Sequence, residues 1–572
     1  MRISLPAAII CQCRTFVAGL GMALAVSIAG CAWYAADADR EVHAVLEKYS
    51  ARALGDRNHS VRQPLALPEE PGDIGQSTAT EPASASNPAV AGSRPASSTV
   101  GSDAQRAVSS QPIEAPGAKP IRLDEALKLA FTSSRDFQDQ KEGLYLSGLG
   151  YTLTRYQFGP ILDNTISYVY NFRENQPYGD SLGADLGVSQ VLPLGGTVGV
   201  TGRVGGSRSN NPAAPLDQQD FNYDSSLVLN LRQPLLRGAG YEASHEALTQ
   251  GQRELLYSIR AFELFREDFS IRVANAYYQL VSQRRQLDND EQNYRDAIYD
   301  RQKAQALRQV DRYKDDDVFL ARRREIEAED ALLQSRTRYN AAIDDFKILL
   351  GMPTTTAIRI VDDEPPFENV RLDPNSAVDV ALKNRLDLHT TLDRVDDAER
   401  RTRIAGNQLL PDLNVTGSIG LDSDPTPYDE ARPRRSNGSV GVELKLPLDR
   451  KSERNAYRSA QIGLNQARRE LTRQQDEVTR DVLDQLRVLR QVEKRIDLQA
   501  DQVKFETRAV EVTRIRYESG EASTRDLLDA RRALNSAQNS LIELRVQHFI
   551  GRLRLRRTLG ILFIDESGMW PS

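Results

Sequence analysis

Two stretches of this chain repeat one another, and they decide its fold. Residues 123–167 read LDEALKLAFTSSRDFQDQKEGLYLSGLGYTLTRYQFGPILDNTIS, and residues 374–418 read PNSAVDVALKNRLDLHTTLDRVDDAERRTRIAGNQLLPDLNVTGS. They align without a gap at an offset of 251, which places Ala126 on Ala377 and Pro160 on Pro411. A second pair of segments aligns at an offset of 209, where Asp317 falls on Asp526. A period of this length indicates a duplicated domain rather than a solenoid.

A strand region follows the repeated segment in each half. In the second half, apolar residues at 413, 415, 419 and 421 alternate with polar or small ones, and residues 440–446 alternate in the same way. A period of two predicts strands with one apolar and one polar face. The pattern fits a half-buried soluble sheet and also a membrane barrel with its apolar face toward lipid.

The strand region of the first half is 38 residues longer than that of the second. The insert predicts an additional hairpin over 183–206, with a tight turn at Pro193–Gly196. Longer polar loops are expected at Arg173–Gly183 and Ser207–Asn222. The sequence therefore predicts four strands in the first half (about 163–233) and two in the second (about 412–447).

Very long helices are predicted after the strands. No proline interrupts residues 241–312 or 452–517, and at 1.5 Å per residue each helix is roughly 100 Å long. Val482, Leu489 and Ile496 begin a series of apolar positions seven residues apart that runs to Tyr517. Such a heptad seam predicts helix-on-helix packing along a coiled coil.

The N-terminal part predicts export. Arg2 and Arg14 precede a short apolar run, so residues 1–30 are interpreted as a signal peptide. The run ends Ile28-Ala29-Gly30-Cys31, which resembles a lipoprotein box with Cys31 as the lipidated residue; the alternative is an ordinary signal with a chance cysteine. Ala32, rather than an aspartate, favours sorting to the outer membrane.

The predicted domain organisation follows from these features. Residues 31–120 form a lipid-anchored tether that is rich in Pro, Ala, Ser and Gly and contains one short helix near 37–54. The first repeat covers 121–351, a linker 352–374, the second repeat 375–564 and a tail 565–572. The fold class is α+β and mostly α, with an internal two-fold duplication.

Several function classes are excluded on composition and motifs. The chain has 74 Lys and Arg against 80 Asp and Glu, with both signs mixed along it, so nucleic acid is not an expected partner. No phosphate loop, metal-ligand cluster or nucleophile constellation is present, so neither an enzyme nor a cofactor or metal site is expected. A lipid-anchored periplasmic coiled-coil scaffold without a pore is the alternative function, although it leaves the alternating segments unexplained.

Two motifs resemble those of a known family. Leu231-Arg-Gln-Pro-Leu-Leu-Arg-Gly238, and Arg516-Tyr517-Glu-Ser-Gly520 followed by Asp526-Leu-Leu-Asp529-Ala-Arg531, are similar to those of the TolC family of outer-membrane efflux proteins. The resemblance implies a homotrimer in the outer membrane: a shared β-barrel continued by a periplasmic helical tube. It implies a passive conduit, for efflux or for type I secretion, that works with a periplasmic adaptor and an inner-membrane transporter.

The number of strands gives a separate argument that several chains close one barrel together. Six strands, or four, are too few for a barrel whose smallest known form has eight. An open strand edge in lipid is not viable, so several chains must share one barrel.

The resemblance also implies roles for individual residues. Asp526 and Asp529, with Asp317 as the first-half counterpart, would line the periplasmic aperture, and Tyr517 would help to latch the helices. Charge rings of this kind select cations, and mutual repulsion is expected to raise some of their carboxyl pKa values. The chain departs from the family pattern at Ala522, where the latch arginine is missing, and at Tyr313–Asp317, which lacks the usual glycine turn.

Overall fold

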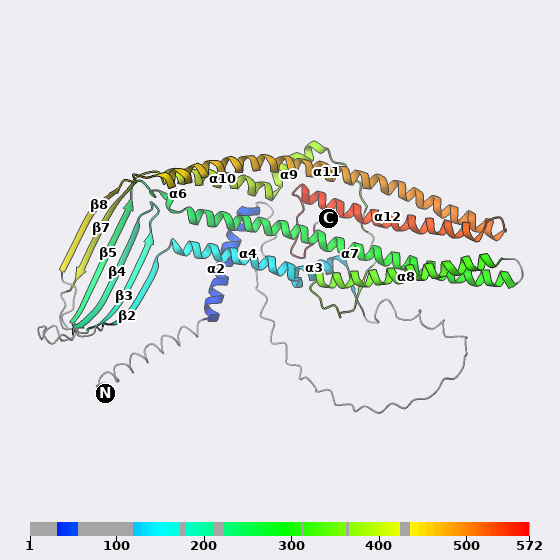
Figure 1. The fold of residues 1–572 in the computed structure, drawn as a ribbon, viewed down its shortest axis with the longest axis horizontal. Coiled ribbons are helices and arrows are strands. Elements are labelled where there is room, and N and C mark those ends of the chain that lie inside the picture. Colours follow the sequence, from blue (N-terminus) through cyan, green and yellow to red (C-terminus); the bar gives the residue numbers. More distant parts are fainter. Residues whose placement is uncertain are drawn as a thin grey trace, which may run out of the picture.

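The computed structural model describes residues 31–54, 118–171, 179–209, 222–309, 314–361, 365, 367–423 and 435–570. The predicted signal peptide and most of the tether lie outside these residues. The first repeat contains β1 (Lys119–Ile121), α3 (Leu123–Ser133), α4 (Arg135–Gln157), β2 (Ile161–Asn171), β3 (Gly179–Val191), β4 (Thr197–Ser209), β5 (Asn222–Pro234), α6 (Tyr241–Ser244), α7 (Glu246–Gln309) and α8 (Asp315–Leu349). The second contains β6 (Ile358–Ile360), α9 (Pro374–Asn384), α10 (Leu386–Asn407), β7 (Asp412–Asp422), β8 (Arg435–Lys445), α11 (Lys451–Glu518) and α12 (Thr524–Thr558). The predicted mostly helical fold with short strands is confirmed (Figure 1).

The four strands of the first repeat and the two of the second form a single antiparallel sheet in the order β2-β3-β4-β5-β7-β8. The predicted strand counts are therefore confirmed. Both predicted loops were too long, because Gly179–Gly183 belong to β3, residues 207–209 to β4 and Asn222 to β5. The other residues of the two predicted loops lie outside the described ones. The polar and small residues there extend the ladder, because their backbone groups pair regardless of side-chain type, as Gly179 does with Ser209.

The two faces of the sheet differ in polarity, as the alternation predicted. Register places one apolar row across five strands, namely Leu162, Val188, Val200, Leu229 and Ile419. A row three residues further along, on the other face, contains Thr165, Asp185, Arg203, Ser226 and Asp422. Leu162 and Ile419 are 62% and 63% exposed, so none of the described helices covers this apolar row.

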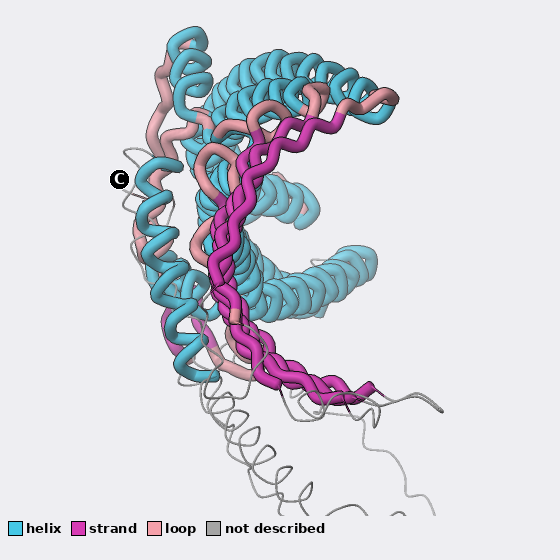
Figure 2. The backbone as a smooth tube through the Cα atoms, turned by 90° about the vertical axis from the view of Figure 1, so that its left-hand side faces the viewer, coloured by secondary structure: helices cyan, strands magenta, loops and turns pink. Residues whose placement is uncertain are grey.

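The sheet is an open arc with free edges at β2 and β8 (Figure 2). The helices follow the same curvature, and α2 (Cys31–Leu54) and the C-terminus lie on the convex side of the arc. The structure therefore has a concave and a convex face along its whole length.

The long helices form two hairpins. α7 packs against α8, α11 packs against α12, and α12 packs against α7. This leaves α8 and α11 at the two outer edges of the helical array. α7 has 64 residues and α11 has 68, which is close to the predicted lengths. None of the described helices carries an apolar stretch of the length that a membrane span requires.

The first half of the predicted heptad seam is buried, and its later positions Val503, Val510 and Tyr517 are half-buried. Val482, Leu489 and Ile496 on α11 are at most 5% exposed. One detail differs from the prediction: the first long helix begins at Glu246 rather than Tyr241. The chain turns at His245, whose ring stacks on Tyr241 with centroids 4.5 Å apart and packs against Phe158. This packing favours a separate turn, α6, before α7.

The main core lies midway along the helices on the convex side. There α3, the parallel pair β1–β6 and the C-terminal residues 562–570 cover α7 and α12. The buried residues that make it up include Phe269, Val273 and Tyr277 of α7 and Leu562 and Ile564 of the tail.

The N-terminal helix α2 begins at Cys31, six residues before the predicted start. Its apolar face docks across α4 and α7, where Val42 and Leu46 are buried and Tyr49 donates to or accepts from the hydroxyl of Tyr151 at 3.0 Å. The close approach depends on Gly148, since a Cβ there would lie 2.8 Å from a methyl group of Val42.

Candidate functional site

The predicted aperture residues all lie at the tip of the helical half, farthest from the sheet. There the α11–α12 hairpin turns through residues 519–523, and Gly520 has φ +80, a left-handed conformation that favours glycine. The glycine of the Tyr-x-x-Gly motif is thus explained by the turn. The corresponding turn of the α7–α8 hairpin, residues 310–313, lies outside the described residues.

Asp526 is the third residue of α12 and forms a capping box with Ser523. Its carboxylate accepts the backbone N–H of Ser523 at 2.9 Å and the Ser523 hydroxyl at 2.7 Å. These hydrogen bonds from Ser523, side chain first, lower the pKa of Asp526. Within one chain, these local donors stabilise the charged form of Asp526, and the repulsion expected between carboxylates of neighbouring copies stays a prediction.

Asp317 occupies the same position at the start of α8. It is also the third residue of its helix, and its carboxylate accepts the backbone N–H of Lys314 at 3.2 Å. The alignment of Asp317 with Asp526 thus corresponds to a shared capping function. Both carboxylates retain exposure at the tip, so capping does not remove them from an aperture.

Asp529 connects the two hairpins. It accepts a hydrogen bond from Arg324 of α8 at 3.0 Å, and its side chain is 55% exposed while that of Arg324 is 9% exposed. A parallel pair joins Arg532 of α12 to Glu327 of α8 at 2.7 Å. Asp526 and Asp529, which were predicted to act alike, therefore differ: one caps its own helix and the other bridges helices.

The predicted latch residue Tyr517 also connects the hairpins. The Nζ of Lys303 on α7 lies 4.4 Å from the centroid of the Tyr517 ring on α11. Ala522 offers only a methyl group, and its backbone N–H donates to the carbonyl of Arg516 at 3.1 Å. At the tip, the two hairpins are therefore joined by this cation–π pair and by ion pairs such as Asp529 with Arg324. Ala522 takes no part in these ion pairs.

Cys31, the predicted lipidation residue, begins α2, and its side chain lies outside the described residues. Within the part of the chain that the structure describes, no group of three or more His, Cys, Asp or Glu side chains is arranged to hold a metal ion.

Two sets of residues were missed by the sequence analysis. One is a buried ion-pair network between α7 and α10 centred on Arg400. The other is a pair of exposed apolar stripes at the edges of the helical array: Phe319, Ile326 and Leu333 on α8, and Leu498, Phe505 and Val512 on α11. The spacing of seven within each stripe was visible in the sequence. The network had no comparable signal, since charged residues on a helix are usually solvated.

Comparison with known proteins agrees with this architecture. Residues 377–561 match the family model described as outer membrane efflux protein. The chain is similar to the alkaline protease secretion protein AprF of Pseudomonas aeruginosa, with 27% identity over 383 residues that cover 62% of this chain and 73% of AprF.

Solved structures share the fold at low identity. The outer membrane protein VceC of Vibrio cholerae aligns over 77% of this chain and 96% of its own, with a TM-score of 0.58 and 17% identity. The CmeC outer membrane channel of Campylobacter jejuni aligns over 78% and 86%, with a TM-score of 0.58 and 14% identity. The second repeat thus matches a family model of outer membrane efflux proteins, and the chain shares the fold of these outer membrane channels.

Proposed function

We propose that this chain assembles as a homotrimer into a passive export conduit, anchored by a lipid on Cys31 and connected through a periplasmic adaptor to an inner-membrane transporter. The observation that carries the proposal is the pair of incomplete edges. β2 and β8 each have one unpaired side, and the sheet is an open arc with an exposed apolar face. Unpaired strand edges are not tolerated in lipid, so they must pair with other copies. Three copies give eighteen strands.

The helical array has matching edges. Phe319, Ile326 and Leu333 on α8 are 71%, 53% and 50% exposed. Leu498, Phe505 and Val512 on α11 are 60%, 76% and 45% exposed. α8 runs away from the tip and α11 runs toward it, so the two stripes lie at similar heights and can pack in an antiparallel seam between neighbouring subunits. Exposed apolar stripes of this kind mark an interaction surface.

A double substitution tests this assembly. Ile326→Glu with Phe505→Glu should bury charge in each subunit seam, and the detergent-extracted protein should lose its heat-sensitive oligomer on a gel. Val488→Glu is the matched control, because Val488 is 50% exposed on α11 but lies about a quarter turn from the stripe. Retention of the oligomer by the double variant, with the mass of three chains by light scattering, would contradict the proposed seam.

The aperture is proposed at the helical tip. Asp526, Asp529 and Asp317 lie there, and three copies would form rings of carboxylates that favour cations. Tyr517 with Lys303, and Asp529 with Arg324, are the proposed latch contacts between the hairpins. Asp529→Ala with Asp526→Ala should lower the cation selectivity of single channels in planar bilayers, and wild-type selectivity in that variant would move the aperture elsewhere.

Protein secretion is the proposed cargo class. AprF is by its name a secretion protein for an alkaline protease, and it is the curated relative described above. Deletion of the gene should then abolish export of one protein substrate without changing sensitivity to small toxic compounds. The opposite pattern would assign the conduit to small-molecule efflux.

A further inference from the structure

The two faces of α7 midway along the tube have different environments. Phe269, Val273 and Tyr277 face the main core on the convex side. Asn275 lies at the opposite side of the helix, because a rotation of about 100° per residue places it roughly half a turn from Val273, and Arg272 lies about a quarter turn from Val273. These polar residues therefore lie away from the main core on the convex side. The opposite, concave side of the arc (Figure 2) is the interior of the conduit in the proposed assembly.

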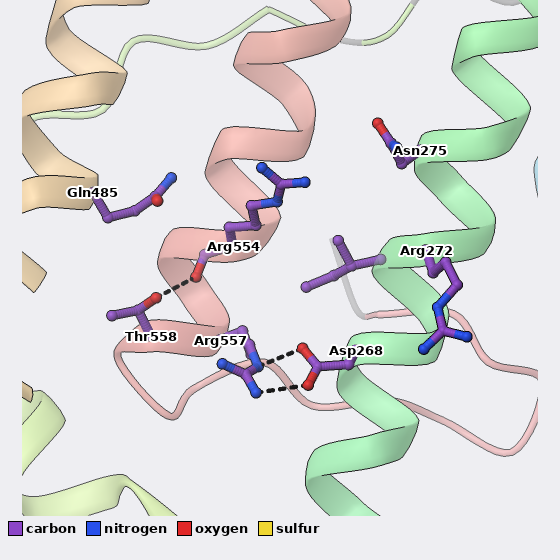
Figure 3. Close-up of a pocket in the computed structure, with 8 residues that line it drawn as sticks. Asp268, Arg272, Asn275, Gln485, Arg554, Arg557 and Thr558 are labelled. Carbon is purple, nitrogen blue, oxygen red and sulfur yellow. Dashed lines mark hydrogen bonds and ion pairs between the residues drawn. The ribbon is translucent and has the colours of Figure 1, made fainter. Parts of the chain in front are cut away.

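A cavity of about 370 Å³ opens at this position between three helices. α7 contributes Arg272 and Asn275, α12 contributes Arg554 and Arg557, and α11 contributes Gln485 (Figure 3). The side chains stand on both sides of the gap between α7 and α12, the helices that join the two repeats.

The cavity carries a surplus of positive charge. Its lining has three arginines and one carboxylate, Asp268. Asp268 is already held by Arg557 through two contacts of 2.6 Å. Arg272 lies 3.3 Å from Asp136 on α4, but both side chains are at least half exposed, so this pair is weak and exchangeable. Two guanidinium groups from different helices are thus available to a ligand.

We propose that this cavity binds oxyanions, that is carboxylate or phosphate groups of cargo passing along the concave face. Arginine presents planar donors that match carboxylate and phosphate geometry. Basic residues at the end of α12 also interact favourably with the negative C-terminal end of its helix dipole. That effect would explain Arg554 and Arg557, but it explains neither Arg272 on α7 nor the cavity. In the proposed trimer, which this part of the inference rests on, nine arginines would form a cationic ring distant from the acidic tip.

Binding can be measured without transport. Isothermal titration calorimetry of the detergent-extracted full chain with inorganic pyrophosphate, and separately with citrate, should show saturable binding of at least one probe. Arg272→Gln with Arg554→Gln should weaken that binding by about tenfold or more. Arg272→Lys with Arg554→Lys should retain part of it. Arg40→Gln, on the convex side in α2, where Arg40 pairs with Asp37 of the same helix, should leave it unchanged.

Each outcome decides the proposal. No saturable heat with either probe, or equal affinity in the wild type and the Arg272/Arg554 double variant, would overturn it. A drop of the same size in Arg40→Gln would also overturn it, because the effect would then be general charge. A further test adds polyglutamate to wild-type pores in planar bilayers, and block of the current is expected. Pores that conduct but are not blocked would show that the cavity does not bind anions inside the conduit, while the proposed channel function would still stand.

Discussion

The junction between the two repeats differs between its two ends. Near the sheet, α7 meets α10 through buried charges: Arg400 is 7% exposed and contacts Glu246 at 2.6 Å and Asp397, which is 3% exposed, at 2.9 Å. Tyr257 donates to Asp397 at 2.7 Å. At the tip, Asp529, Glu327 and Arg532 are each about half exposed, and Arg324 is the buried member of these two ion pairs.

This difference has an energetic consequence. Exposed ion pairs contribute about 0–1 kcal/mol, whereas removal of one member of a buried network leaves an uncompensated charge and costs about 3–5 kcal/mol. Polar cavities of about 380 and 210 Å³ also line the α7–α12 gap toward the tip. The repeats are therefore fixed to each other near the sheet and only weakly connected at the tip, so the tip is the part of the tube that can move.

The largest expected effect comes from breaking the sheet-side network. Arg400→Ala should lower the free energy of unfolding by about 3–5 kcal/mol, because Asp397 and Glu246 would lose their shared cation. Thermal unfolding of the detergent-extracted protein measures this. Arg403→Ala is the matched control on the same helix: Arg403 pairs with Glu242 at 2.5 Å but is 59% exposed, and its loss should cost no more than about 1 kcal/mol. Equal losses in the two variants would contradict the comparison.

Removal of the tip contacts should change the channel conductance more than the stability of the fold. Asp529→Ala with Glu327→Ala removes two contacts between the hairpins, so resting single-channel conductance should rise. The unfolding temperature should fall by less than in Arg400→Ala. Planar-bilayer recording and thermal unfolding of the same preparation give both quantities. A tip variant that is as unstable as Arg400→Ala and keeps wild-type conductance would reverse the roles of the two ends.

The smallest effect concerns the cap at the start of α12. The folded-state pKa of Asp526 lies below its ordinary value of 3.8, so its contribution is fully present above that value and is lost as pH falls through the lowered one. Asp526→Ala should increase amide exchange at residues 523–527 near neutral pH. The difference from wild type should shrink below about pH 4. A difference that persists undiminished at lower pH would exclude the capping carboxylate as its cause.

The sequence predicted those features that follow a period. The duplication, the alternation in the six strands and the heptads of α11 predicted the element order and the polarity of the sheet. The tip residues Asp526 and Tyr517 were found through motif resemblance, but their actual contacts were not. Whether a carboxylate caps a helix, as Asp526 does, or bridges two, as Asp529 does, depends on which helix lies beside it. The same holds for the pairs of Arg400 with Glu246 and of Arg272 with Asp136, because in each pair the partner lies more than a hundred residues away in the sequence.

The most direct test of a fixed sheet-side joint and a weakly held tip is a pair of distance measurements between spin labels in the extracted protein. One pair would replace the exposed residues Arg323 on α8 and Arg525 on α12, and the other Glu254 on α7 and Arg401 on α10. In the Asp529→Ala, Glu327→Ala background, the account predicts that the tip distance lengthens and broadens while the sheet-side distance stays as in the wild type. A sheet-side distance that changes as much as the tip distance, or a tip distance that does not change, would contradict it.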